Sequence, residues 1–115
     1  MSAEDQDSET RAVAVLVSAP SRAEARRLAR LLLEQGLAAC VQLSPIDSLY
    51  LWKDAIQEDE EILMIVKTRA ALFPALEALL RESHGYETPE ILALPVSAGS
   101  APYLEWLRAS TRDPA

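Results

Sequence analysis

Two uninterrupted apolar runs constrain the fold of this chain more than any other feature. Residues 12–17 read Ala-Val-Ala-Val-Leu-Val, and residues 62–66 read Ile-Leu-Met-Ile-Val. Runs of this length that are rich in valine and isoleucine are typical of strands buried on both faces. Such strands lie in the middle of a sheet and not at its edge. The sequence therefore predicts a sheet in which these two segments are the central strands.

Helical patterns follow each of these runs. Residues 21–24 have the form of a capping box, Ser-Arg-Ala-Glu, and apolar residues at helical spacing continue to Gly36. A second amphipathic pattern runs over residues 72–84, with Pro74 in its first turn. Ser100 is placed to cap a final short helix that ends near Arg112. These patterns predict three helices.

The segment between the first two helices indicates a long β-hairpin. From Ala38, apolar and polar residues alternate as far as Trp52, and the polar pair Lys53-Asp54 marks a turn before the run at 62–66. Pro45 lies in the first arm, and proline is confined to edge strands and bulges because it cannot donate a ladder hydrogen bond. The first arm is therefore predicted as an edge strand, and residues 91–96 as the fourth strand.

The predicted element order is β-α-β-β-α-β followed by a C-terminal helix, an α+β fold of the ferredoxin-like sandwich type with a long β-hairpin. Both helices of the sandwich cover one face of the sheet, because right-handed crossovers place them there. The opposite face of two apolar central strands then needs a cover that a single chain does not supply. We therefore expect an obligate oligomer.

Composition limits the organisation and the partners of the chain. With 115 residues, 50% of them hydrophobic, it is expected to form one domain over residues 11–112. Residues 1–10 read as a disordered acidic tail, and residues 113–115 as a short second tail. The net charge of −7 disfavours nucleic acid and favours cations as partners. A single cysteine, no run long enough to span a membrane and no signal peptide predict a cytoplasmic protein without a membrane partner.

The segment at residues 84–90, His-Gly-Tyr-Glu-Thr-Pro-Glu, has the highest concentration of candidate site residues in the chain. It contains the only histidine, with a phenol and the carboxylates of Glu87 and Glu90, which suit metal binding or acid/base chemistry. The alternative is a helix end, with His84 in the last turn and Gly85 in a left-handed exit conformation. An enzyme is not expected, because the chain has no asparagine, no glycine-rich phosphate loop and no recognisable catalytic triad.

Several ordered strings resemble one protein family. They include Gly-Leu-Ala-Ala-Cys-Val at 36–41, Ser-Leu-Tyr-Leu-Trp-Lys at 48–53 and His-Gly-Tyr-Glu-Thr-Pro-Glu-Ile-Leu-Ala-Leu-Pro-Val at 84–96. In these strings, and from about Val13 to Arg112, the chain resembles the CutA family of divalent-cation tolerance proteins. The resemblance implies a tight ferredoxin-like homotrimer, similar to PII signalling regulators, that binds copper or another divalent cation. No cofactor is expected to be required for folding.

The resemblance also implies site residues. It places six residues around a cleft between subunits: Tyr50, Trp52, Glu61, Lys67, Tyr86 and Glu90. The candidate metal ligands are His84, Glu87 and Glu90. Relatives implicated in copper binding carry a cysteine where this chain has Val17 and a histidine where it has Ser83, so His84 alone would anchor a copper site. The alternative to a cleft role for Tyr50 and Trp52 is packing across subunits. The alternative function of the protein is a PII-like trimeric module for small ligands or signalling, without tight metal binding.

Overall fold

The computed structural model describes residues 11–114. The tail predicted at residues 1–10, and Ala115 of the tail predicted at 113–115, lie outside the described residues. The helices and strands, in chain order, are β1 (Ala12–Ala19), α1 (Arg22–Glu34), β2 (Cys40–Trp52), β3 (Ala55–Arg69), the 3-10 turn η2 (Ala70–Leu72), α2 (Phe73–Ser83), β4 (Ile91–Pro95) and α3 (Ala101–Ala109).

The strands form one antiparallel sheet in the order β2-β3-β1-β4. The two apolar runs lie in β1 and β3, which are neighbours in the middle of the sheet, with Val15 opposite Val66. Each of these strands is paired on both sides, which explains why the two runs contain no polar residue. The predicted α+β class is confirmed.

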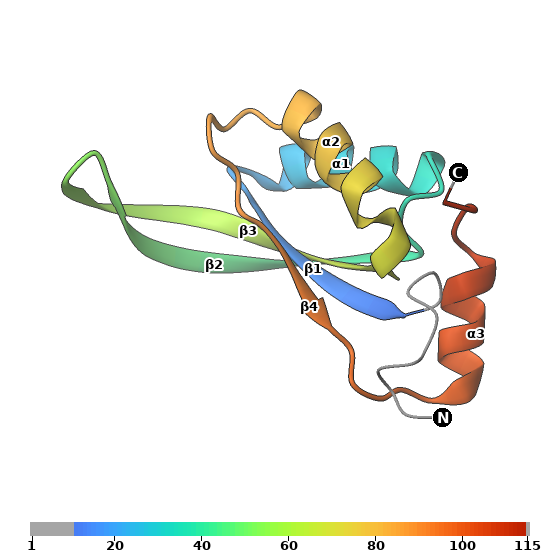
Figure 1. Ribbon diagram of the computed structural model, residues 1–115. Coiled ribbons are helices and arrows are strands. Elements are labelled where there is room, and N and C mark those ends of the chain that lie inside the picture. Colours follow the sequence, from blue (N-terminus) through green and yellow to red (C-terminus); the bar gives the residue numbers. More distant parts are fainter. Residues whose placement is uncertain (1–10, 115) are drawn as a thin grey trace.

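The core lies between the sheet and the helices α1 and α2, which cover the same face (Figure 1). Alternate residues of β1 and β3 point into it, and Val15, Val17, Met64 and Val66 have no exposed surface. Leu28, Leu32, Leu76 and Leu80 of the two helices are equally buried and pack in the same cluster. This packing fixes the sheet relative to both helices.

The helix α1 begins and ends at the residues that the sequence indicates. The Ser21 hydroxyl accepts a hydrogen bond from the Glu24 N–H at 3.1 Å, while the Glu24 carboxylate pairs with Arg27 at 2.5 Å. Gly36 follows the helix with φ of +70°, a conformation that costs glycine little. The predicted cap at Ser21 is therefore confirmed.

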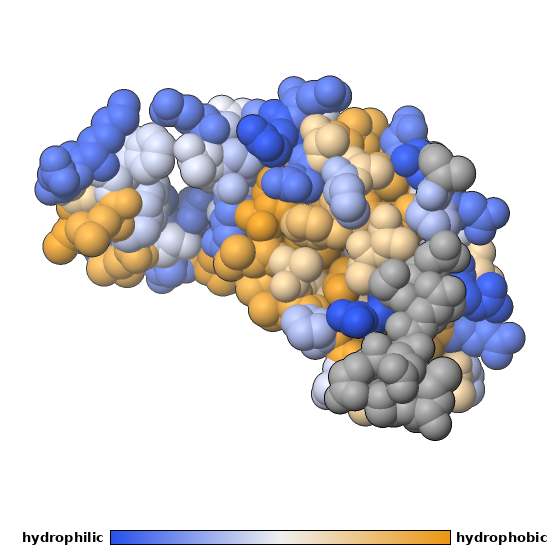
Figure 2. Space-filling model, in the orientation of Figure 1, coloured by the Kyte–Doolittle hydropathy of each residue, from blue (hydrophilic) through white to orange (hydrophobic). Residues whose placement is uncertain are grey.

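The opposite face of the sheet is less covered. Leu92 and Leu94 of β4 are 56% and 47% exposed, and α3 contacts β3 near one end of the sheet. In Figure 2, apolar side chains gather over the middle of the molecule and again along the projecting hairpin. A surface of this kind is expected to pack against another protein surface.

The hairpin of β2 and β3 extends well beyond the helices (Figure 1) and accounts for the 48 Å length of the molecule. Its pairing is continuous from Cys40 opposite Lys67 to Trp52 opposite Ala55. Lys53 and Asp54 form the turn with φ of 52° and 65°, the backbone of a two-residue hairpin loop. Pro45 lies in β2, an edge strand, as its missing N–H requires.

Candidate functional site

The larger of two neighbouring cavities, about 800 Å³, lies where the hairpin meets the segment between α2 and β4. Its walls come from Ser18 at the end of β1, from the hairpin residues 47–50, Trp52 and Glu61, and from residues 85–90. Three segments far apart in the sequence thus meet here. The sheet topology brings them together, because β1 and β3 are neighbours and the segment before β4 contacts the end of β1 at Ser18 and the middle of β3 at Glu61.

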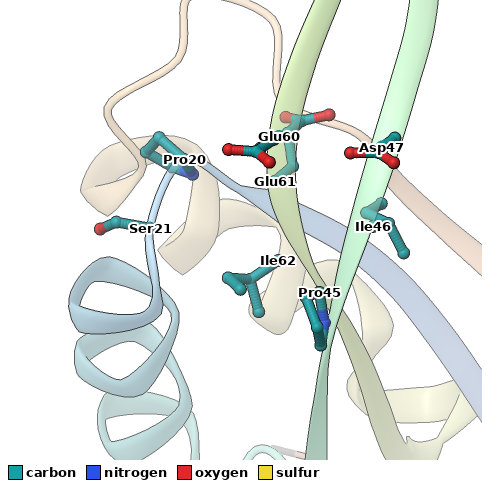
Figure 3. A pocket seen from close by; sticks show the side chains of 8 residues that line it. All are labelled: Pro20, Ser21, Pro45, Ile46, Asp47, Glu60, Glu61 and Ile62. Carbon is teal, nitrogen blue, oxygen red and sulfur yellow. The ribbon is translucent and has the colours of Figure 1, made fainter.

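A second cavity, about 420 Å³, lies beside the first, between the hairpin and the start of α1. Figure 3 shows Glu60 and Glu61 on β3 and Asp47 on the neighbouring strand β2, with Pro20 and Ser21 across the cavity from them. Asp47 and Glu60 are direct cross-strand partners, an arrangement in which like charges repel. Glu61 and Asp47 line both cavities, so the negative charge is shared between them.

Tyr86 and Glu61 form the central polar contact of the larger cavity. The Tyr86 hydroxyl donates a hydrogen bond of 2.6 Å to Oε2 of Glu61, a residue of β3 that is only 8% exposed. Burial of the phenol, and then this hydrogen bond to a carboxylate, raise the pKa of Tyr86 well above its usual value. Tyr86 therefore remains a neutral donor that holds residues 84–90 against β3.

Tyr50 makes a similar contact on the hairpin. Its hydroxyl donates to the carboxylate of Asp59, and this hydrogen bond raises the pKa of Tyr50. Tyr50 is directly opposite Gln57, so Asp59 is its diagonal neighbour on the same face of the hairpin. Both tyrosines that line the cavity are thus fixed by a carboxylate from β3.

His84 is buried, and both of its ring nitrogens make hydrogen bonds. Its Nε2 lies 2.7 Å from the carbonyl oxygen of Ser18, and its Nδ1 lies 3.1 Å from the backbone nitrogen of Tyr86. A carbonyl can only accept and a backbone N–H can only donate, so the proton is on Nε2 and the lone pair of Nδ1 is occupied. In this arrangement His84 joins the end of β1 to the segment before β4.

The helix α2 ends at Ser83, as the sequence indicates, but by a different mechanism from the predicted one. His84 has an extended backbone, and Gly85 has no left-handed φ; a Cβ at Gly85 would meet no atom within 4 Å. The predicted exit through a left-handed Gly85 is therefore wrong. Arg27 of α1 instead donates a 2.6 Å hydrogen bond to the free carbonyl of Ser83, which satisfies one acceptor at the helix end.

The structure brings most of the predicted cleft residues together. Tyr50, Trp52, Glu61, Tyr86 and Glu90 all line the larger cavity, and so does Glu87. Lys67 does not join them: it lies six residues from Glu61 along β3, about 20 Å at the usual rise, with its ammonium 6.0 Å from the ring centre of Tyr103. Its predicted role at the cleft stays a prediction.

The predicted metal ligands do not form a coordination site within one chain. Within residues 11–114, no group of three or more His, Cys, Asp or Glu side chains is placed to hold a metal ion. The lone pair of His84 is already used, and Glu87 and Glu90 are exposed at the cavity wall. Metal binding by these three residues stays a prediction that requires donors from another subunit or a rearrangement.

Two carboxylates of the site were not among the predicted residues. They are Asp59, which accepts the hydrogen bond from Tyr50, and Asp47, which lines the larger cavity. A register argument would have found Asp59, because a turn at Lys53-Asp54 makes Tyr50 and Asp59 diagonal neighbours. The same register places Asp47 of β2 directly opposite Glu60 of β3, and this pairing would have indicated Asp47.

Comparison with known proteins gives one consistent result. Residues 13–110 match the family described as CutA1 divalent ion tolerance protein. The chain is 48% identical over 99 residues to Protein CutA of Homo sapiens, covering 85% of this chain and 55% of that protein. It is 42% identical over 102 residues to Protein CutA 1, chloroplastic, of Oryza sativa subsp. japonica, covering 88% and 58%. The chain thus spans little more than half the length of these relatives.

A solved structure agrees in fold. The periplasmic divalent cation tolerance protein CutA from Archaeoglobus fulgidus superposes with a TM-score of 0.85 at 38% identity, covering 86% of this chain and 97% of that one. None of the helices in the described part of the chain is both long and apolar enough to cross a membrane.

Proposed function

Because the chain belongs to the CutA1 divalent ion tolerance family, we propose that it acts in divalent-cation tolerance, binding copper or another divalent cation as a homotrimer. The match over residues 13–110 carries this proposal. The acidic cavity supports it, since carboxylates that line a shared space attract cations. We assign the fold to the ferredoxin-like sandwich, because each helix connects two strands that flank a third strand of the sheet.

Assembly into a trimer is supported by the open face of the sheet. Leu92 and Leu94 lie exposed beside partly buried residues of β1 and β3, and the hairpin carries exposed Leu49, Leu51 and Ile56. Burial of these residues against copies of the same chain would remove apolar surface from water, at about 25 cal/mol per Å². The subunits would then supply donors to each other's cavities, which the metal proposal requires.

We place the metal contacts of this chain at Glu87 and Glu90 in preference to His84. The two glutamates are exposed at the cavity and free to turn toward an ion, whereas His84 would have to give up the hydrogen bond from Tyr86. Carboxylates bind divalent cations through oxygen, and the affinity depends on how many donors converge. A binding role, not a catalytic one, fits a family named for ion tolerance. The cytoplasmic location stays a prediction.

A calorimetric titration of the purified chain with copper and zinc tests the metal assignment. We expect the double variant Glu87→Gln, Glu90→Gln to weaken binding about tenfold or more, because each change removes a charged ligand. The variant Glu34→Gln, which makes the same charge change at the far end of α1, should bind as the wild type does. If the double variant binds normally while His84→Ala binds no copper, the imidazole is the anchor and our assignment is wrong.

The second candidate function is a PII-like small-ligand module, and the size of the cavity favours it. A volume of about 800 Å³ is far larger than a metal ion requires and falls in the range of small-molecule sites. A titration with a panel of small ligands that includes nucleotides and organic amines, in the same series as the metals, separates the two functions. Heat with a member of this panel but not with copper or zinc would support the module and contradict the metal proposal.

A further inference from the structure

We propose that the larger cavity binds an aliphatic polyamine, with one ammonium group at the buried carboxylate of Glu61. This inference deepens the small-ligand function proposed above and rests on it. The ligand class follows from three properties of the cavity: the sign of its charge, the unused hydrogen-bonding capacity of Glu61, and the different depths of its carboxylates in a wall that also carries aromatic rings.

The charge of the cavity wall selects a cation. Four acidic residues line it, Asp47, Glu61, Glu87 and Glu90, and none of the lining residues in the described part of the chain is lysine, arginine or histidine. The wall is therefore uniformly negative, and field lines concentrate in such a recess. Phosphates, nucleotides and carboxylic acids are repelled from this wall, whereas ammonium groups are attracted to it.

Glu61 has an acceptor that the protein does not use. The residue is 8% exposed, and its Oε2 accepts the hydrogen bond from Tyr86. Its other oxygen, Oε1, has no hydrogen-bond or ion-pair partner among residues 11–114. No fully buried polar side-chain atom in that range lacks a partner, so Oε1 keeps some exposed surface, and Glu61 lines the cavity. A carboxylate in so buried a position is stabilised by a cation that donates hydrogen bonds to it.

The carboxylates of the cavity lie at different depths, because Glu61 is 8% exposed whereas Glu87 and Glu90 are exposed. No three acidic, histidine or cysteine side chains of the described residues converge on one point. A chain of ammonium groups separated by methylenes meets this arrangement, with one group at Glu61 inside and another at the exposed Glu87 and Glu90. Each ammonium group has three donors and needs a separate acceptor set.

Aromatic side chains complete the match. Tyr50, Trp52 and Tyr86 line the same cavity, and the two tyrosines are held in place by hydrogen bonds to Asp59 and Glu61. Aromatic faces attract ammonium groups, and aromatic surfaces also pack well against methylene chains. Because the rings are already fixed, little side-chain entropy is lost when a ligand binds.

Calorimetric titration of the full chain with spermidine, in buffer containing EDTA, tests the inference. We expect measurable heat with spermidine and none with tetraethylene glycol, an uncharged chain of similar length. Glu61→Gln should weaken spermidine binding about tenfold or more, because it removes the charge but keeps an acceptor for Tyr86. Glu34→Gln, at the far end of α1, should leave the affinity unchanged.

Two results would overturn the inference: no heat with spermidine, or an equal loss of affinity in Glu61→Gln and Glu34→Gln, which would indicate general attraction to an acidic surface. If Glu61→Gln does not fold, the double variant Glu87→Gln, Glu90→Gln decides in its place, since both residues are exposed. EDTA removes divalent cations, so failure with spermidine leaves the metal titration unaffected, and failure with copper and zinc leaves this result unaffected.

Discussion

At the scale of single residues, the segment before β4 is held by side chains that lie far apart in the sequence. His84 bonds to the carbonyl of Ser18 and to the N–H of Tyr86, and Tyr86 bonds to Glu61. The ionisable side chains His84, Tyr86 and Glu61 thus hold the segment at residues 84–90 in place through hydrogen bonds. This explains why the imidazole, the first candidate ligand, is the least available donor of the segment.

Removal of the Tyr86 hydroxyl should destabilise the protein. Tyr86→Phe leaves a largely buried Glu61 carboxylate without its donor, which costs about 1–3 kcal/mol. Urea unfolding at neutral pH measures this loss. Glu34→Gln is the control, because Glu34 is exposed and has no comparable contact.

The same variant should change how stability depends on pH. The pKa of Tyr86 is raised in the folded state, so its stabilising contribution is complete below the ordinary phenol value of 10.0. The contribution is lost as the pH rises beyond that value, because the unfolded phenol ionises first. Urea unfolding between pH 8 and 11 should therefore show a shallower loss of stability in Tyr86→Phe than in the wild type. An equal slope in both proteins would contradict this assignment.

At the scale of elements, the hairpin determines the site. The turn at Lys53-Asp54 sets the register, and the register places Tyr50 beside Asp59 and Ile46 opposite Glu61. A shift by one residue would turn every side chain of β2 to the other face and separate Tyr50 from Asp59. The positions of the hairpin side chains in the cavity wall therefore depend on the two residues of the turn, Lys53 and Asp54.

Asp54→Gly should stabilise the hairpin. Asp54 has φ of 65°, a left-handed conformation that costs non-glycine residues about 1–2 kcal/mol and aspartate somewhat less. We expect a gain of up to about 1 kcal/mol in the free energy of unfolding, measured by urea denaturation. Ala55→Gly, one residue later at the start of β3, is the matched control and should destabilise. A loss of stability in Asp54→Gly would show that the aspartate side chain supports the turn.

Hydrophobic patterns predicted the helices and strands well, but they did not predict the polar contacts between these elements. The two apolar runs gave the central strands, Pro45 gave the edge strand, and Ser21 gave the start of α1. Periodicity reports which residues face a core, so it carries this information directly. It does not report which polar atoms meet, so the contacts of His84 with Ser18 and of Tyr86 with Glu61 could not be read from the sequence.

At the scale of the whole molecule, a single chain leaves surfaces exposed that are expected to pack against another protein surface. One face of the sheet exposes Leu92 and Leu94, the hairpin projects without a cover, and the acidic cavity is open at its edge. The trimer that we propose would cover the apolar surfaces and add donors to the cavity. The metal binding that we propose would therefore depend on assembly, and the proposed polyamine site would lie beside the same subunit boundary.

Light scattering on the purified chain at micromolar concentration tests this dependence most directly. We expect a single species of about 38 kDa, three times the 12.6 kDa of one chain, and the same mass after dialysis against EDTA. The EDTA step separates assembly through apolar surfaces from assembly through bridging metal ions. A stable species of 12.6 kDa would rule out the proposed trimer, because the open sheet face and the metal site that needs donors from another subunit would then have no partner.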